Sequence, residues 1–312
     1  MISIKPYSIE YKKAWDDFVV NSKNATFLHF RDYMDYHKNR FLDHSLIIFK
    51  GEKLIALFPA NIKDEVMYSH QGLTFGGLLF SERSTTTEVL EIFEQICLYA
   101  KTLNVKKIIY KCIPYIYYKY PAQEDLYALF RLKAKRIGCN NSSVILQNNP
   151  IAFSELRGRG VKKAKKNELY IAKQDSFDLF WKVLYDNLHE KYDTKPVHSV
   201  EEITSLKNKF PENIEHYLVF TKDNEPVAGT VMYLTERVAH VQYISSTIDG
   251  RNCGALDFLF DHLVNNVYKD KTYFDFGIST EQMGNYLNEG LIFQKEGFGG
   301  RGVVYETYEI II

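Results

Sequence analysis

The feature of this sequence that most restricts its fold is an internal repeat. Residues 45–60 consist of an apolar run, a tight turn at 50–53 and a second apolar run. The same pattern returns at residues 217–233, around a turn at 222–225. Each copy predicts a β-hairpin. We therefore expect two related units along the chain.

The same elements follow each hairpin: a strand, a loop, a helix and a closing strand. The helices are indicated by apolar residues at the three- and four-residue spacing of one helix face. Two amphipathic helices precede each hairpin. We expect strands at 65–69, 107–110, 238–245 and 273–276, unit helices through Val89–Tyr99 and Leu256–Val267, and preceding helices at 11–20, 30–38, 177–190 and 200–209. The fold class is thus α/β (α+β), with two units in tandem.

A polar turn at Asn148–Pro150 predicts the boundary, giving units 1–150 and 151–312. The chain has 312 residues, enough for two domains, and its 46% apolar content is that of a globular protein. There are 39 Lys and Arg residues and 39 Asp and Glu residues, so the formal net charge is zero and does not favour binding to nucleic acid. The four cysteines lack metal-binding spacing, and no apolar run approaches the ~20 residues of a membrane span. We expect a cytoplasmic protein without a metal or membrane insertion.

The loop after the third strand differs between the copies. In the second copy, Thr247–Ala255 contains two glycines and Arg251 directly before a helix. Small residues let backbone amides turn inward, and a helix N-terminus attracts phosphate, so this loop is a candidate pyrophosphate site. The first copy has no glycine at 81–87 and carries Glu82. An ordinary turn with a capped helix is the alternative. On the first reading, the second unit binds a phosphorylated cofactor and the first is a degenerate copy with an acceptor-binding or packing role.

Several segments resemble known families. Arg251–Ala255 resembles the acyl-CoA loop of the GNAT acetyltransferase superfamily, R/Q-x-x-G-x-G/A, with matches at Arg251 and Gly254 and with Leu256 at the final small position. The tandem arrangement and the basic stretch Arg157–Lys166 resemble the Fem-type transferases. Blocks at 70–77, 195–198, 273–277 and 287–291 resemble nucleotide-sugar N-acyltransferases. The resemblance implies that each unit has a mixed, mainly antiparallel, twisted sheet flanked by helices, and that acyl-CoA (coenzyme A) is the co-substrate.

The resemblance also implies where ligands bind. Strand 243–246 would splay from the strand ending at Phe276 and expose its backbone to the pantetheine arm, with Gly277 and Asn285 beside the thioester. The implied cofactor-binding residues are Tyr243, Ile244, Ser245, Ser246, Arg251, Asn252, Cys253, Gly254, Ala255 and Asn285. The candidate substrate-binding residues are His70, Gln71, Arg157, Lys163 and Tyr192.

Attack on a thioester requires a neutral amine, so a proton acceptor is helpful. His198 is the first candidate, because the capping box Ser199–Glu202 places it before a helix N-terminus, where the dipole disfavours imidazolium. Glu281, after the closing strand, is the second. The alternatives are a packed histidine and a solvated carboxylate. Asp275 alternates with two phenylalanines and is expected to be buried with a partner rather than to act as the base.

Three functions follow from these features. The first is acyl-CoA-dependent N-acylation of a nucleotide-linked amino sugar, of the dTDP-aminodeoxyhexose type, in surface polysaccharide (lipopolysaccharide) biosynthesis. The second is Fem-type transfer from aminoacyl-tRNA to a peptidoglycan precursor, which requires tRNA affinity that a net charge of zero does not favour. The third is an inactive binding module, against which the retained Arg251 and Gly254 argue.

Overall fold

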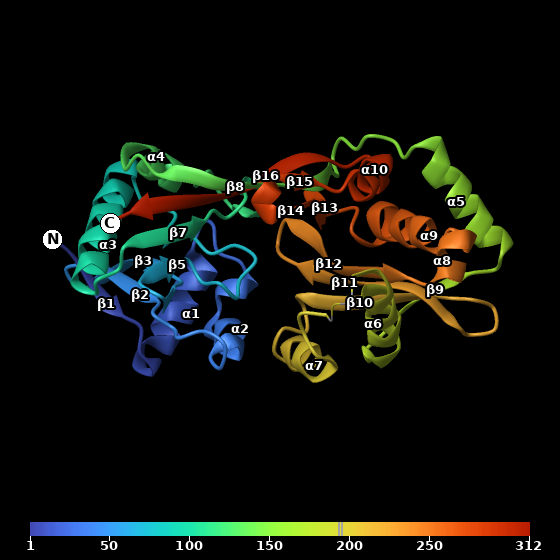
Figure 1. Ribbon diagram of the computed structural model, residues 1–312, viewed down its shortest axis with the longest axis horizontal. Coiled ribbons are helices and arrows are strands. Elements are labelled where there is room, and N and C mark those ends of the chain that lie inside the picture. The colour runs from blue at the N-terminus through green and yellow to red at the C-terminus, as the bar shows by residue number, and fades with distance from the viewer. Residues whose placement is uncertain (193, 195) are drawn as a thin grey trace. The chain divides into compact units, whose positions relative to one another are not determined.

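The computed structural model describes residues 1–192, 194 and 196–312, without the side chains of His37, Leu188, Glu190, Lys191 and Tyr192. The chain forms two compact units. Unit 1 comprises Met1–Asn140, Thr280–Tyr286 and Val304–Ile312, and unit 2 comprises Asn141–Ser279 and Leu287–Val303. The boundary predicted at 148–150 lies within unit 2, and the chain re-enters unit 1 twice after that point (Figure 1).

Unit 1 contains the first predicted hairpin, β2 (Leu46–Lys50) and β3 (Lys53–Phe58), paired antiparallel as expected. With β1 (Ile2–Pro6) and β6 (Leu79–Phe80) they form a sheet in the order β1-β2-β3-β6. A second set of strands runs in the order β4-β5-β7-β16. These strands are β4 (Asn61–Lys63), β5 (Val66–Tyr68), β7 (Lys107–Lys111) and β16 (Arg301–Ile311). The predicted strand and hairpin order of the first copy is therefore confirmed.

The helices of unit 1 lie near their predicted positions. The predicted helix 30–38 is divided into one α-helical turn, α2, and a 3-10 turn, η3. The helical elements are η1 (Ile9–Tyr11), α1 (Lys12–Asn21), η2 (Phe27–His29), α2 (Arg31–Met34), η3 (Asp35–His37), α3 (Thr86–Thr102), η4 (Tyr115–Tyr117), α4 (Glu124–Arg131) and η6 (Gln282–Gly284).

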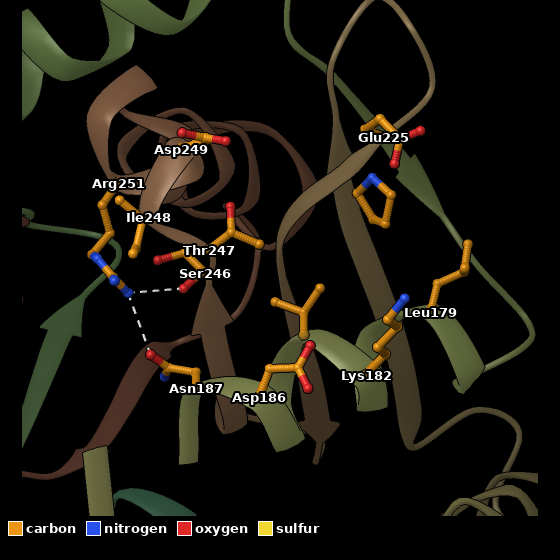
Figure 2. A pocket seen from close by; sticks show the side chains of 12 residues that line it. Leu179, Lys182, Asp186, Asn187, Glu225, Ser246, Thr247, Ile248, Asp249 and Arg251 are labelled. Carbon is orange, nitrogen blue, oxygen red and sulfur yellow. Dashed lines mark hydrogen bonds between the residues drawn. The ribbon is translucent and has the colours of Figure 1, made fainter. Parts of the chain in front are cut away.

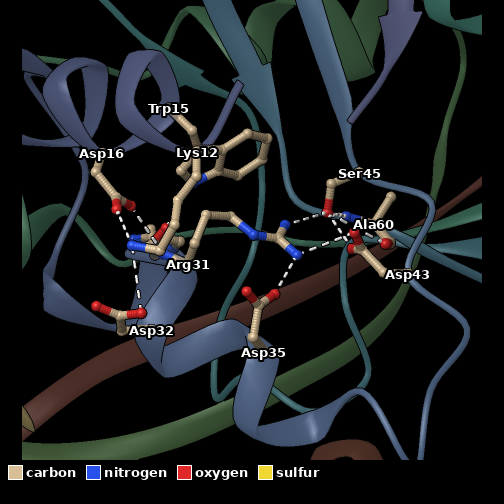
Figure 3. A network of polar contacts seen from close by, with 10 residues as sticks. Lys12, Trp15, Asp16, Arg31, Asp32, Asp35, Asp43, Ser45 and Ala60 are labelled. Atoms are coloured by element: carbon tan, nitrogen blue, oxygen red, sulfur yellow. Dashed lines mark hydrogen bonds and ion pairs between the residues drawn. The ribbon is translucent and has the colours of Figure 1, made fainter. Parts of the chain in front are cut away.

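A buried arginine ties α2 to the segments directly after β1 and before β2 (Figure 3). Arg31 is 2% exposed, and its Nη2 donates to Asp35 at 2.5 Å and to Asp43 at 3.0 Å. Its guanidinium carbon lies 3.8 Å from the centroid of the Tyr7 ring. A buried charge is costly unless it is paired and hydrogen-bonded. These contacts explain the buried arginine by its role in the fold, without a ligand.

Unit 2 has a sheet in the order β8-β13-β12-β11-β10-β9. Neighbouring strands are antiparallel except β12 and β13, which are parallel. The strands are β8 (Lys135–Leu146), β9 (Tyr170–Lys173), β10 (Ile214–Phe220), β11 (Pro226–Leu234), β12 (Val238–Ser246) and β13 (Tyr273–Ile278), and the two-residue strands β14 (Thr280–Glu281) and β15 (Tyr286–Leu287) pair separately. The second hairpin and the mixed, mainly antiparallel sheet are confirmed.

Helices cover both faces of this sheet, with α6 and α7 on one side and α8 and α9 on the other (Figure 1). The aromatic side chains of Phe260, Phe274 and Phe276 pack on the α9 side, each at most 3% exposed. Each such burial contributes about 1.5–3 kcal/mol. The helical elements are α5 (Glu155–Lys166), α6 (Asp178–Tyr192), α7 (Val200–Lys209), α8 (Ile248–Cys253), α9 (Ala255–His262), η5 (Leu263–Val267) and α10 (Glu289–Gly297). In the described residues, no helix is both long and apolar enough to span a bilayer.

Candidate active site

β12 and β13 separate after a short parallel contact. Only Val238–His240 pair with Tyr273–Asp275. β12 continues to Ser246 beside β11, whereas β13 kinks at Gly277, which has φ +73°. Among the described strands, none pairs with β12 from residue 241 onward on its β13 side. The predicted splay is confirmed, and it leaves backbone donors and acceptors of β12 open to an extended ligand.

A histidine–aspartate pair occupies the last paired position before the strands separate. His240 Nδ1 lies 2.8 Å from Oδ2 of Asp275, which has no exposed surface. The other carboxylate oxygen accepts from Ser142 Oγ at 2.5 Å and from the Gly277 amide at 2.9 Å. Three donors hold this carboxylate in place, and the carboxylate in turn fixes a proton on Nδ1. In the neutral ring, Nε2 then carries the lone pair.

The faces of the strands show which side these groups occupy. Val241 and Phe274 belong to the apolar core on the α9 side, so the alternating His240 and Asp275 face α6 and α7. A bulge in β12 near residue 242 brings Tyr243 to that same face. The face therefore carries several polar side chains that can reach the splay.

The predicted base His198 is paired with a predicted cofactor residue. Its Nδ1 is hydrogen-bonded to the Tyr243 hydroxyl, and its carbonyl accepts from Trp181 Nε1 at 3.0 Å. The capping box predicted after it is confirmed, with Glu202 N donating to Ser199 Oγ at 3.2 Å and Ser199 N to Glu202 Oε2 at 2.8 Å. His198 is 5% exposed. The histidine is thus held where it can orient the tyrosine hydroxyl.

A lysine that the sequence did not single out secures the end of β13. Lys295 of α10 is 5% exposed, and its Nζ donates to the carbonyls of Gly277 at 2.8 Å and Ile278 at 2.7 Å. Burial lowers the pKa of Lys295 to about 8. The chain carries this cation directly beside the kink that opens the splay.

A pocket of about 410 Å³ lies at the C-terminal end of β12, between α6 and the start of α8 (Figure 2). Arg251 points into it and donates to the Ser246 carbonyl at 2.9 Å and to Asn187 Oδ1 at 3.3 Å. Lys182 adds a second cation. The pocket also carries three carboxylates, those of Asp186, Glu225 and Asp249. Its charge is therefore mixed rather than uniformly basic.

The predicted open loop at 247–255 is wrong, because residues 248–253 form the short helix α8. The Thr247 hydroxyl caps it by accepting from the Gly250 amide at 3.0 Å, and the Arg251 amide donates to the Thr247 carbonyl at 3.0 Å. The amides of Gly250, Arg251 and Gly254, which were expected to help surround a diphosphate, are thus engaged within α8 and its caps. Threonine before the helix and glycine after it are strong capping residues, and this local preference determines the conformation.

The glycines of this segment are explained by close packing. A Cβ on Gly250 would lie 2.1 Å from the Val227 carbonyl, and one on Gly254 would lie 2.4 Å from the Gly160 carbonyl. Gly254 and Ala255 are buried, Cys253 is half-buried and Asn252 is exposed. Two of the residues predicted to bind the cofactor, Arg251 and Ser246, line the pocket at the end of β12. Ile244 packs against the core and Ser245 Oγ donates to the Val183 carbonyl at 3.2 Å.

Four of the residues predicted to bind ligands or to act in catalysis belong to unit 1, and these roles stay predictions. His70 is 2% exposed and has φ +56°, and its ring centroid lies 5.8 Å from that of Phe41. Gln71 is clamped by Asn61, which accepts from its amide at 2.7 Å and donates to its side chain at 2.8 Å. The other two, Glu281 and Asn285, are exposed.

Of the basic stretch, Arg157 is engaged inside unit 2. Its Nη1 lies 2.6 Å from Asp257, and its guanidinium stacks over Phe298 at 5.5 Å. This contact joins α5 to α9, so the guanidinium is already neutralised. Lys163 is exposed on α5. The side chain of Tyr192 lies outside the described residues. In those residues, no group of His, Cys, Asp and Glu is arranged to hold a metal.

The two residues most clearly missed are His240 and Lys295. Asp275 was expected to have a buried partner, and His240 is that partner. In the sequence, the pair was indicated only by a polar residue at alternate positions in two strands. The pairing of β12 with β13, which brings the two residues together, joins segments far apart in sequence.

Comparisons with known proteins address the fold. No protein-family model matches the chain, and no curated protein matches its sequence. A solved structure of FemX has a TM-score of 0.69 at 11% identity, covering 99% of this chain and 97% of that one. L-PGS from Bacillus licheniformis has a TM-score of 0.64 at 12% identity, with coverages of 97% and 92%.

A tandem GNAT protein from the clavulanic acid biosynthesis pathway is similar at a TM-score of 0.55 and 9% identity, covering 99% of this chain and 98% of that one. Such low identities establish architecture and leave chemistry to the site. The predicted resemblance in fold is confirmed: the chain has a tandem GNAT-like fold of the Fem type.

Proposed function

We propose that this protein is an acyltransferase, and that unit 2 transfers an acyl group from coenzyme A to an amine at the splay between β12 and β13. The observation that carries the proposal is the unpaired edge of β12 beside two histidines whose Nδ1 atoms are both engaged. An extended pantetheine chain carries amides that can pair with such an edge as a strand would. This edge would align the thioester with the polar face of the sheet.

His240 is the proposed proton acceptor. As the amine attacks the thioester carbonyl, a C–N bond forms and the nitrogen becomes acidic, so Nε2 can take its proton. Asp275 stabilises the imidazolium that results. Collapse of the tetrahedral intermediate breaks the C–S bond and releases the thiolate of coenzyme A. We assign the proton that this thiolate takes up to the Tyr243 hydroxyl, which is hydrogen-bonded to His198.

This assignment changes the role given to His198. Its Nδ1 is hydrogen-bonded to a hydroxyl and not to a carboxylate that would stabilise the imidazolium, so we assign His198 the role of a positioning residue that acts through Tyr243. Glu281 remains an alternative acceptor of the proton. Because both substrates must be held in register, positioning supplies much of the rate in any such reaction.

The acceptor we propose is a nucleotide-linked amino sugar used in surface polysaccharide synthesis. The support is the sequence resemblance of the blocks at 70–77 and 273–277 to nucleotide-sugar N-acyltransferases. His70, Gln71, Lys163 and Tyr192 remain the candidate acceptor contacts. We expect the protein to act in the cytoplasm, where such sugars and acyl-CoA are both present.

The donor assignment is tested by a thermal melt with acetyl-CoA. Ligand that binds only the folded protein raises the melting temperature. We assign the cofactor phosphates to Arg251, which lines the pocket at the end of β12, so Arg251→Glu should abolish that rise. Arg159→Glu, an exposed site on α5, is the matched control and should keep the rise. No shift in the native protein, or an unchanged shift in Arg251→Glu, would contradict the assignment.

One observation favours aminoacyl-tRNA as a second candidate donor. The helix α8 replaces the open phosphate loop, and carboxylates share the pocket with Arg251. A donor that does not need a diphosphate cradle would tolerate both features. Filter binding of charged tRNA separates the candidates: salt-sensitive tRNA binding together with no effect of acetyl-CoA on the melt would favour the Fem-type reaction.

A further inference from the structure

A second pocket of unit 2 lies on the opposite face of the sheet, away from His240. It has a volume of about 360 Å³ and is enclosed by α5, by residues 150–153, and by the end of α9 with η5. Small-molecule sites typically measure about 300–1,000 Å³. Its inner wall includes Ile145, Phe153 and Val264, which are part of or packed against the apolar core. The floor is therefore apolar.

One face of α5 closes the pocket. Gly158, Val161, Lys162 and Lys165 line it, and their spacing of three, four and seven residues places them on a single stripe of the helix. A Cβ on Gly158 would meet no atom within 4 Å. The glycine thus leaves open space where any larger side chain would project into the pocket.

The rim is positively charged. Within the described part of the chain, no hydrogen bond or ion pair engages Lys162 or Lys165, and both are exposed. Asp261, the one carboxylate of the lining, accepts from Asn265 Nδ2 at 2.9 Å. Two cations face one carboxylate that already has a donor. An anionic group is the partner that completes this rim.

We propose that this pocket binds a small amphipathic anion, a compact apolar group attached to a phosphate or carboxylate. The apolar part lies against Ile145, Phe153 and Val264, and the anion meets Lys162 and Lys165. This site is independent of the proposed acyl transfer, because its residues come from the opposite face of the sheet.

The test is calorimetric titration with monomeric octyl phosphate, with inorganic phosphate and octyl glucoside as the single-feature probes. We expect saturable binding of octyl phosphate, and binding of each single-feature probe that is weaker by roughly tenfold or more. Lys162→Glu/Lys165→Glu should weaken octyl phosphate by a similar factor. Arg159→Glu/Lys166→Glu, on the same helix outside the stripe, changes the net charge equally and should bind as the native protein does.

Gly158→Leu separates loss of binding from loss of stability. Leucine is a better helix former than glycine, and a Cβ at this position meets no atom within 4 Å. The variant should therefore melt at a higher temperature while losing octyl phosphate. Equal weakening by the two double variants, or full binding by Gly158→Leu, would overturn the proposal. So would binding to phosphatidic acid vesicles with no binding of monomeric octyl phosphate, since that result indicates a charged surface rather than a pocket.

Discussion

Asp275→Asn should remove the proton-accepting ability of His240 while leaving the fold intact. The native carboxylate accepts from Ser142, from the Gly277 amide and from His240 Nδ1. Asparagine has the same shape, and its oxygen can keep the first two donors. Its NH₂ then faces Nδ1 as a donor, which favours the other imidazole tautomer, with the proton on Nε2. A protonated Nε2 cannot accept a proton from the amine.

The magnitudes follow from these contacts. All three hydrogen bonds to the charged carboxylate become bonds between neutral groups, which lowers the free energy of unfolding by about 1 kcal/mol each. Removal of a buried charge offsets much of this loss. Loss of a general base costs about 10²- to 10⁴-fold in turnover. The stability change is therefore small and the loss of turnover large.

Two measurements check this prediction. Long-range nitrogen–proton NMR of the imidazole reports the tautomer without any substrate, and His240→Gln identifies the resonance. Thiol release from acetyl-CoA in the presence of amino sugars reports turnover, with Ser142→Ala as the control that keeps the His240–Asp275 contact. An unchanged tautomer, or turnover within about threefold of the native value despite a changed tautomer, would refute the reasoning.

Three further predictions concern the same unit. His198→Ala and Tyr243→Phe should each lower turnover, and the double variant should lose no more than either one, because the two side chains act as one pair; additive losses in a double-mutant cycle would contradict this. Burial lowers the pKa of His216 from 6.5 to about 4, so protonation favours the unfolded chain and the free energy of unfolding falls as the pH drops below 6.5. In urea unfolding, the free energy of unfolding of His216→Phe should therefore fall by about 2 kcal/mol less between pH 7 and pH 5 than that of the native protein. An equal fall in both proteins would argue against this. Gly254→Ala should destabilise the fold by about 2 kcal/mol or more, because its Cβ would contact the Gly160 carbonyl at a residue with positive φ. Gly158→Ala should instead stabilise the fold by about 0.5–1 kcal/mol. Similar melting temperatures for the two variants would be inconsistent with this packing.

The features that sequence reasoning predicted well are local. The hairpins arise from two apolar runs around a tight turn, and the capping box at Ser199–Glu202 arises from residues three apart. Such signals require no knowledge of distant segments. The resemblance to known transferases added the splay of β12 from β13, which the pairing of these strands confirms.

The features that sequence reasoning missed depend on distant contacts. His240 becomes part of a site only because Asp275, thirty-five positions away, is its neighbour across a parallel pair. The glycines at 250 and 254 resemble a phosphate loop in sequence, yet their reason is the close approach of Val227 and Gly160. A glycine required for packing and one required for ligand approach look identical in a sequence. Only the backbone carbonyls opposite them distinguish the two.

A crystal structure with an unreactive thioether analogue of acetyl-CoA would show where the donor binds. The pantetheine amides are expected to pair with the open edge of β12 between Val241 and Ser246, with the acyl carbonyl within reach of His240. Density for the analogue elsewhere, with the edge of β12 empty, would contradict the proposed acyl transfer at this site.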